Sequence, residues 1–216
     1  MRFLDANGSD PIYASSLFGR IKHIGDDGND LGAAYLVQGK VKREVINQMK
    51  MKGFYSGDLS VSRNVMHIPS RTQINEIAVS INDTLEHGKE NGGHAKSGTE
   101  GVSRWDQGQN PEIIQQDGTI IVKASIAPFV VNGETVLPQM DSIDYMWHVH
   151  PNVSIGGYSL GASVPSNNDM QHFGKMEKAG YSVTAFVVGA RDKRVSFYDA
   201  EGSYKTISLE QLLKIY

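Results

Sequence analysis

The chain has 216 residues, of which 39% are hydrophobic and 21% charged, and its net charge is -3. This composition is ordinary for a globular protein, and the length fits one domain or one domain with an extension. We expect no nucleic-acid or membrane partner, because the chain has neither a basic block nor an apolar run of roughly 18 residues. It contains no cysteine, which excludes disulfides, thiolate metal sites and cysteine nucleophiles.

The first 68 residues are punctuated by glycine and aspartate. Such punctuation is typical of turns, and only residues 41–51 have the apolar spacing of a helix. We therefore predict that residues 1–68 are an extension or linker with little local structure. Residues 69–216 are predicted to form the main domain.

A helix is predicted over residues 72–87. Ser70 and Gln73 form a capping box at its start, and Gly88 ends it. Its apolar positions repeat at helical spacing along one face: Ile74, Ile77, Ala78, Ile81 and Leu85. The polar residues 97–118 that follow are expected to form a loop.

The second half of the main domain alternates strand and helix signals. Asn132-Gly133 predicts a hairpin between residues 119–128 and 129–137, since both turn positions need positive φ. Further strands are expected at residues 142–150, 181–188 and 195–199, and helices at 167–179 and 208–215. The pattern indicates an α+β or three-layer α/β/α domain, whose mixed, largely antiparallel sheet is flanked by helices.

Two histidines end the strand at residues 142–150. Side chains alternate along a strand, so His148 and His150 point to one side, about 7 Å apart along the backbone. Pro151 ends the strand, and Asp169 lies in the first turn of a helix capped by Ser166. Two histidines and an aspartate are zinc ligands that leave a fourth position open, and zinc held in this way acidifies a water and polarises a carbonyl.

Each of these residues also has an ordinary structural role. Alternate histidines occur on exposed strands, and Ser166 with Asp169 is a common pair at the start of a helix. It is their joint occurrence that favours a metal site. A hydrolase built on it also needs a general base, which must be a carboxylate that does not bind the metal.

His148-Val149-His150-Pro151, followed by Pro165-Ser166-Asn167-Asn168-Asp169, resembles the H-x-H-P and P-S-x-x-D motifs of the JAMM/MPN+ (JAB-like) zinc metallopeptidases. The resemblance covers about residues 70–200. It implies a JAMM/cytidine-deaminase-like fold and Zn2+ held by His148, His150 and Asp169. It also implies a protein or peptide substrate and a transition-state hydrogen bond from Ser166.

The family's base is a glutamate after the first long helix, in a pattern like E-x-x-G. Glu90-Asn91-Gly92-Gly93 matches that pattern, so the resemblance assigns the base to Glu90, with Glu86 and Glu100 as alternatives. The chain departs from the family in two places. The spacer at residues 151–165 is about eight residues longer, and it is interpreted as a flap or a substrate-selecting loop. His94, Ala95 and Lys96 stand where the family has an apolar strand.

The N-terminal Asp5-Ala6-Asn7-Gly8-Ser9-Asp10-Pro11 resembles the peptide that closes the core of RHS-repeat proteins, before their C-terminal toxin. Together the two resemblances imply the JAB-like toxin domain of a bacterial polymorphic toxin. Such a domain is secreted or delivered into a target cell as part of a larger protein, and it has an immunity protein as partner. The start of the chain lacks the apolar stretch of a signal peptide.

The prediction from the sequence is thus a zinc metallopeptidase that cleaves peptide or isopeptide bonds through a zinc-activated water. The alternative is a non-catalytic, MPN-like binding or structural module at the tip of an RHS protein. A zinc hydrolase of another amide is a third possibility that the sequence does not separate from a peptidase.

Overall fold

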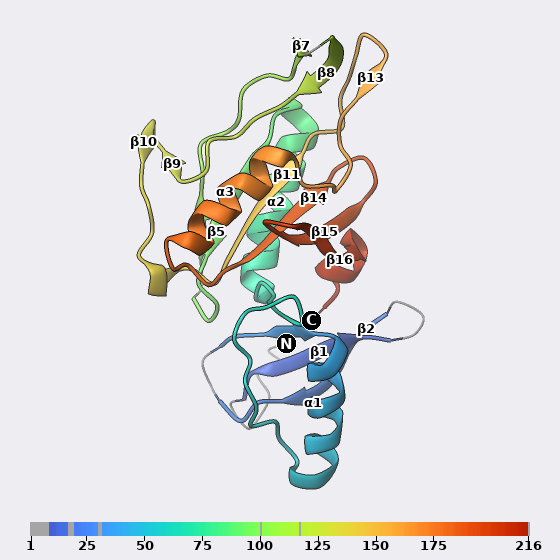
Figure 1. The fold of residues 1–216 in the computed structure, drawn as a ribbon, viewed down its shortest axis with the longest axis vertical. Coiled ribbons are helices and arrows are strands. Elements are labelled where there is room, and N and C mark those ends of the chain that lie inside the picture. The colour runs from blue at the N-terminus through green and yellow to red at the C-terminus, as the bar shows by residue number, and fades with distance from the viewer. Residues whose placement is uncertain (1–8, 17–19, 30–31, 100, 117, 216) are drawn as a thin grey trace.

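The structure of the chain is a computed structural model that describes residues 9–16, 20–29, 32–99, 101–116 and 118–215. The larger part is built on a six-stranded sheet, ordered β16-β15-β14-β11-β5-β6 (Figure 1). Its strands are β5 (Asn91–Ala95), β6 (Ser103–Arg104), β11 (Tyr145–His150), β14 (Thr184–Gly189), β15 (Arg194–Asp199) and β16 (Gly202–Ser208). Within this sheet β11 and β14 are parallel, and the other neighbours are antiparallel.

Helices cover both faces of this sheet (Figure 1). On one face, α2 (Arg71–His87) and α4 (Leu209–Leu213) pack on a core that includes Trp147 and Phe186. On the other, α3 (Asn167–Lys178) packs on a second core around Met146 and Tyr198. The predicted α+β class with a mixed sheet is therefore confirmed. No helix in the described part of the chain has the length and apolar character needed to cross a membrane.

The helix predicted at residues 72–87 is confirmed to within one residue. The Ser70 Oγ accepts a hydrogen bond from the Gln73 N–H at 3.3 Å, and the Gln73 side chain accepts one from the Ser70 N–H at 3.0 Å. Gly88 ends the helix with a φ of 68°, a left-handed conformation that glycine adopts without strain. Local capping rules were sufficient at both ends because they involve neighbouring residues alone.

The segment predicted as a loop, residues 97–118, contains strands. β6 lies within it, and β7 (Glu112–Gln116) pairs with β8 (Thr119–Lys123). The Asn132-Gly133 turn is confirmed, with φ values of 52° and 80°, but it joins only β9 (Val130–Val131) and β10 (Glu134–Thr135). Longer strands are interrupted just before β9, because Pro128 lacks an N–H and Phe129 has a φ of 61°.

The other strand predictions are right in kind and shifted at their ends. A 3-10 turn, η1 (Met140–Ser142), precedes β11, so the strand predicted from residue 142 begins only at Tyr145, and Ile143 packs with Met146. β16 was not predicted. It is an edge strand that buries little besides Ile207, which leaves it without a clear alternating pattern.

The described residues before position 69 form more structure than the predicted linker. Four strands in the order β2-β1-β3-β4 form a sheet with its own buried cluster, on which α1 (Gly39–Lys52) packs. The strands are β1 (Pro11–Ser15), β2 (Ile21–Asp26), β3 (Tyr35–Val37) and β4 (Val65–His67). They are short, and β3 pairs with β4 across the whole of α1, so local periodicity did not reveal them. Asp5 to Gly8 of the RHS-like peptide lie outside the described residues.

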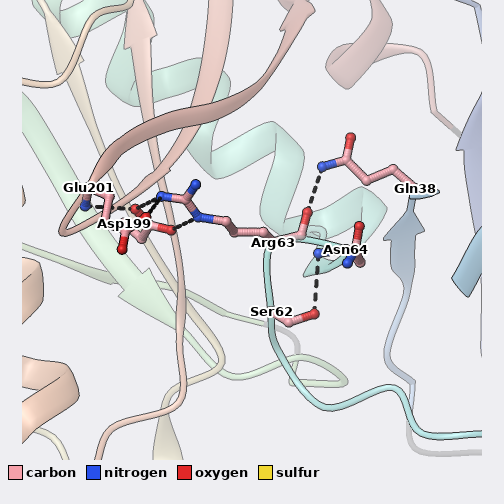
Figure 2. Close-up of polar contacts among 6 residues, drawn as sticks. All are labelled: Gln38, Ser62, Arg63, Asn64, Asp199 and Glu201. Carbon is pink, nitrogen blue, oxygen red and sulfur yellow. Dashed lines mark hydrogen bonds and ion pairs between the residues drawn. The ribbon is translucent and has the colours of Figure 1, made fainter. Parts of the chain in front are cut away.

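Arg63 joins this N-terminal part to the large sheet. Its guanidinium donates from Nε to Asp199 Oδ2 at 2.5 Å and from a terminal nitrogen to Asp199 Oδ1 at 2.8 Å, and it pairs with Glu201 at 2.7 Å (Figure 2). The Arg63 carbonyl accepts a hydrogen bond from the Gln38 side chain at 2.5 Å. A bidentate pair fixes orientation as well as distance. The Arg63–Asp199 pair therefore fixes the position of the N-terminal part against the large sheet.

We expect the contribution of the Arg63–Asp199 pair to stability to disappear in acid. Burial alone would raise the pKa of Asp199, but hydrogen bonds from Arg63 and from the Glu201 N–H lower it below the ordinary 3.8. A lowered folded-state pKa stabilises the protein above the ordinary value, and the effect is lost as pH falls through the folded pKa. The melting temperatures of the wild type and Asp199→Asn should therefore differ at about pH 7 and converge as the pH falls through the lowered pKa of Asp199. A difference that persisted in acid would assign the effect to packing.

Glycines in β5 make room for two tryptophan rings. A Cβ on Gly93 would lie 2.5 Å from the Ser103 carbonyl oxygen and 2.7 Å from the Trp147 ring, and one on Gly92 would lie 3.0 Å from the Trp105 ring. Overpacking of this kind costs about 1–3 kcal/mol. We expect Gly93→Ala to lower the free energy of unfolding, measured by denaturant titration, by about that amount. Gly101→Ala, whose Cβ would meet nothing within 4 Å, is the control.

Candidate metal centre

Three predicted ligands come together at one end of the large sheet. His148 and His150 are the last alternate residues of β11 and lie on the face covered by α3. Asp169 is the third residue of α3. One nitrogen from each imidazole and one carboxylate oxygen all lie within 4.8 Å of one another, so this group of residues could hold a metal ion.

The separations of the donor atoms fit a tetrahedral cation. His148 Nε2 lies 3.0 Å from His150 Nε2 and 3.4 Å from Asp169 Oδ2, and His150 Nε2 lies 3.8 Å from the same oxygen. Ligands held about 2.0–2.1 Å from zinc are separated by about 3.3 Å along a tetrahedral edge. A metal ion at this point would also give the two facing imidazole nitrogens a common partner.

The start of α3 holds Asp169 in place. Its Oδ2 accepts a hydrogen bond from the Ser166 N–H at 2.6 Å, and the Asp169 N–H donates to Ser166 Oγ at 3.2 Å. The predicted cap is thus confirmed as a reciprocal capping box. Since Ser166 Oγ acts as an acceptor there, its own proton remains available for a second hydrogen bond.

A backbone carbonyl orients His150. Its Nδ1 lies 2.8 Å from the Ala162 carbonyl oxygen, which can only accept, so Nδ1 carries the proton. The Nε2 lone pair of a neutral His150 is then left to face the other two ligands. Orientation of a ligating histidine by such a hydrogen bond is common in metal sites.

Ala162 belongs to the long spacer at residues 151–165. The spacer forms a hairpin of β12 (Ser154–Ile155) and β13 (Tyr158–Ser159), which lies beside β8 (Figure 1). Its base is fastened to the β14–β15 turn, because the Ser163 N–H and hydroxyl both donate to Asp192 Oδ2 at 3.0 Å. The spacer therefore contributes to the site itself through Ala162.

Glu90 lies beside the three ligands. β5 runs antiparallel to β11 with Asn91 opposite Val149, a register that places Glu90 next to His150. Glu90 Oε1 is 3.8 Å from His150 Nε2, and the residue is only 7% exposed. Of the alternative bases, Glu86 is exposed on α2 and Glu100 lies outside the described residues.

Charges in the site are strongly coupled. Burial raises the pKa of Glu90, which favours its protonated form. Burial alone would lower the pKa of His148 and raise that of Asp169, but their mutual attraction reverses both effects. Without a metal ion, the aspartate therefore favours a protonated His148, and a bound cation would replace that proton.

Two residues of the site were missed from the sequence. Tyr198 on β15 packs edge-on to the His148 ring, with ring centroids 6.3 Å apart, and His172 lies one turn beyond Asp169 on α3. Both line a cavity of about 30 Å³ that also borders His148 and Asp169. The spacing of His172 from Asp169 is a signal that could have indicated it. No local pattern points to Tyr198.

Comparison of the chain with protein-family models, with curated proteins and with solved structures finds no match in any of the three. The candidate metal centre therefore rests on its geometry.

Proposed function

We propose that the chain is a zinc-dependent hydrolase of peptide or isopeptide bonds. The observation that carries the proposal is the arrangement of four side chains. Three donor atoms converge at tetrahedral spacing, and a buried carboxylate that is not one of them lies 3.8 Å away. A metal site alone would have no use for a buried carboxyl group there, because removing a polar group from water is costly.

The donor set favours zinc over other metals. Two imidazoles and one carboxylate, with no thiolate, suit zinc in a catalytic site, where three protein ligands leave one position open. When bound, zinc would acidify a water and polarise a carbonyl oxygen. His148, His150 and Asp169 would hold it.

The side chains around this position divide the remaining work. Burial raises the pKa of Glu90 and so makes its carboxylate form a stronger base, which would take a proton from water and hand it to the leaving amine. The Ser166 hydroxyl would donate to the oxygen of the tetrahedral intermediate. The Ala162 carbonyl oxygen would keep His150 oriented by accepting a hydrogen bond from His150 Nδ1.

The biological setting is a further part of the proposal. On the two resemblances in the sequence, the domain would act as a toxin delivered into a target cell as part of a larger bacterial protein. It would cut a protein or peptide there and be blocked by an immunity protein.

A second candidate function is a non-catalytic binding module. It is favoured by apolar side chains on the two neighbouring hairpins β7–β8 and β12–β13, where Ile113, Ile120 and Tyr158 are each more than two-fifths exposed. Exposed apolar residues grouped in this way are typical of docking surfaces.

A search for newly formed amino groups tests the proposed function. Zinc-loaded protein would be incubated with amine-blocked proteome peptides and with an isopeptide-linked peptide pair, and new amines would be identified by mass spectrometry. We expect new amines that a zinc chelator suppresses. Their absence from both pools, with zinc bound, would favour the binding module.

A further inference from the structure

A groove runs along α3 from the candidate metal centre. It has a volume of about 250 Å³. From the helix it is lined by Asp169, Gln171, His172 and Lys175, and from the other side by Ile126 and Pro128. The helix residues are spaced so that they share one face. The groove therefore begins at a proposed metal ligand and follows the helix toward its C-terminus.

Lys175 gives the far end of this groove a positive charge. It makes no ion pair with any residue that the structure describes, and among the described lining residues it is the only lysine or arginine. The carboxylate at the near end is already engaged, because Asp169 Oδ2 accepts from the Ser166 N–H and faces His148. The Lys175 ammonium is therefore the charged group that is available to bind a ligand in the groove.

His172, which lines the groove, has a hydrogen-bonding atom without a partner. Its Nε2 is buried and has no hydrogen-bond partner among the described residues. Burial and the nearby Lys175 ammonium lower the pKa of His172, so the ring is neutral at pH 7. A buried polar atom without a partner is unfavourable, and a peptide group that reached Nε2 from the groove would relieve this.

We propose that this groove binds the substrate segment beside the cleaved bond and that Lys175 selects a carboxylate there. The inference rests on the proposed function and names its substrate class, which is an acidic peptide. Six residues of helix separate Asp169 from Lys175, about 9 Å. An extended peptide covers that distance in about three residues. The length of the Lys175 side chain reduces the distance that the peptide has to cover. The carboxylate therefore lies within about two residues of the cleaved bond.

Peptide binding tests the groove without requiring turnover. The probes are three acetylated, amidated tetrapeptides with the sequence Ala-Ala-X-Ala, where X is Glu, Gln or Lys. Their affinities for zinc-loaded Glu90→Gln protein would be measured by calorimetry. We expect the Glu peptide to bind about tenfold more tightly than the Gln peptide, as for a charge-assisted hydrogen bond. Adding Lys175→Glu should reverse the order in favour of the Lys peptide.

Lys178→Glu is the matched control. Lys178 lies in the same last turn of α3 as Lys175 but outside the groove. Lys178→Glu therefore changes the net charge and the electrostatics of the helix as much as Lys175→Glu does. It should leave the preference for the Glu peptide unchanged. Circular dichroism would establish that each variant is folded. If Lys175→Glu is not folded, Lys175→Gln replaces it, and this variant should lose the preference for the Glu peptide without reversing it.

The outcomes separate this inference from the proposed function. Equal affinity for the three peptides, or a preference for the Glu peptide that survives Lys175→Glu, would overturn the proposal that Lys175 selects an acidic peptide in the groove. This holds even if the protein cleaves peptides. A preference for the Glu peptide that depends on Lys175, in a protein that cleaves no peptide, would support the proposed peptide-binding groove and count against the proposed hydrolase function. If the protein cleaves proteome peptides, Asp and Glu should be enriched within two residues of the cut, and Lys175→Glu should remove that enrichment.

Discussion

Glu90→Gln is expected to abolish hydrolysis while leaving zinc in place. Glutamine has nearly the same shape as glutamate but cannot take a proton from water. General-base catalysis contributes about 10²–10⁴-fold to a rate, and we expect kcat to fall by that factor. Glu90 lies 3.8 Å from His150 Nε2 and outside the three converging ligands, so zinc content should not change. Peptide cleavage and elemental analysis of the same sample measure both effects.

Glu86→Gln is the matched control for this experiment. Glu86 was one of the two alternative bases predicted from the sequence, and it is exposed on α2. The variant should keep full activity. Undiminished activity in Glu90→Gln would move the base to another carboxylate. Loss of zinc from Glu90→Gln would instead make Glu90 a metal ligand.

The double variant His148→Ala/His150→Ala is expected to lose zinc completely. The wild type should contain about one zinc per chain, since its three candidate donor atoms lie within 4.8 Å of one another. A ligand that binds only the folded state stabilises it by about 4 kcal/mol when present at a thousand times its dissociation constant. Added zinc should therefore raise the melting temperature of the wild type and leave that of the double variant unchanged.

His23→Ala/His87→Ala removes the same number of imidazoles from exposed positions in β2 and the last turn of α2. It should keep both the zinc and the stabilisation. A wild-type protein without zinc, even after zinc is added back, would refute the hydrolase proposal and leave the binding module as the better explanation.

The three candidate metal ligands were predictable because each depends on short-range geometry. Alternation along β11 directs His148 and His150 to one face, and Pro151 ends the strand directly after them. The capping box at Ser166 places Asp169 in the first turn of α3. These rules operate over two to four residues and hold whatever the rest of the fold does. The bounds of α2 and the turn at Asn132-Gly133 were predictable for the same reason.

The surroundings of the ligands depended on contacts between distant residues. Glu90 was one of three candidate bases in the sequence, and the antiparallel register of β5 and β11 places it beside His150. Tyr198 reaches the site only because β15 pairs with β14, and Ala162 because the base of the spacer is fastened to Asp192. The sheet formed by the described residues before position 69 likewise depends on strands that pair across α1.

The sequence by itself therefore determined the three candidate ligands and the elements that carry them, because strand alternation and helix capping are local. Only the tertiary structure decided which carboxylate accompanies them, which carbonyl orients His150 and which groove leads away from Asp169. Strand register and the packing of α3 against residues 126–128 arise when distant segments bury apolar surface together. A local pattern does not contain that information.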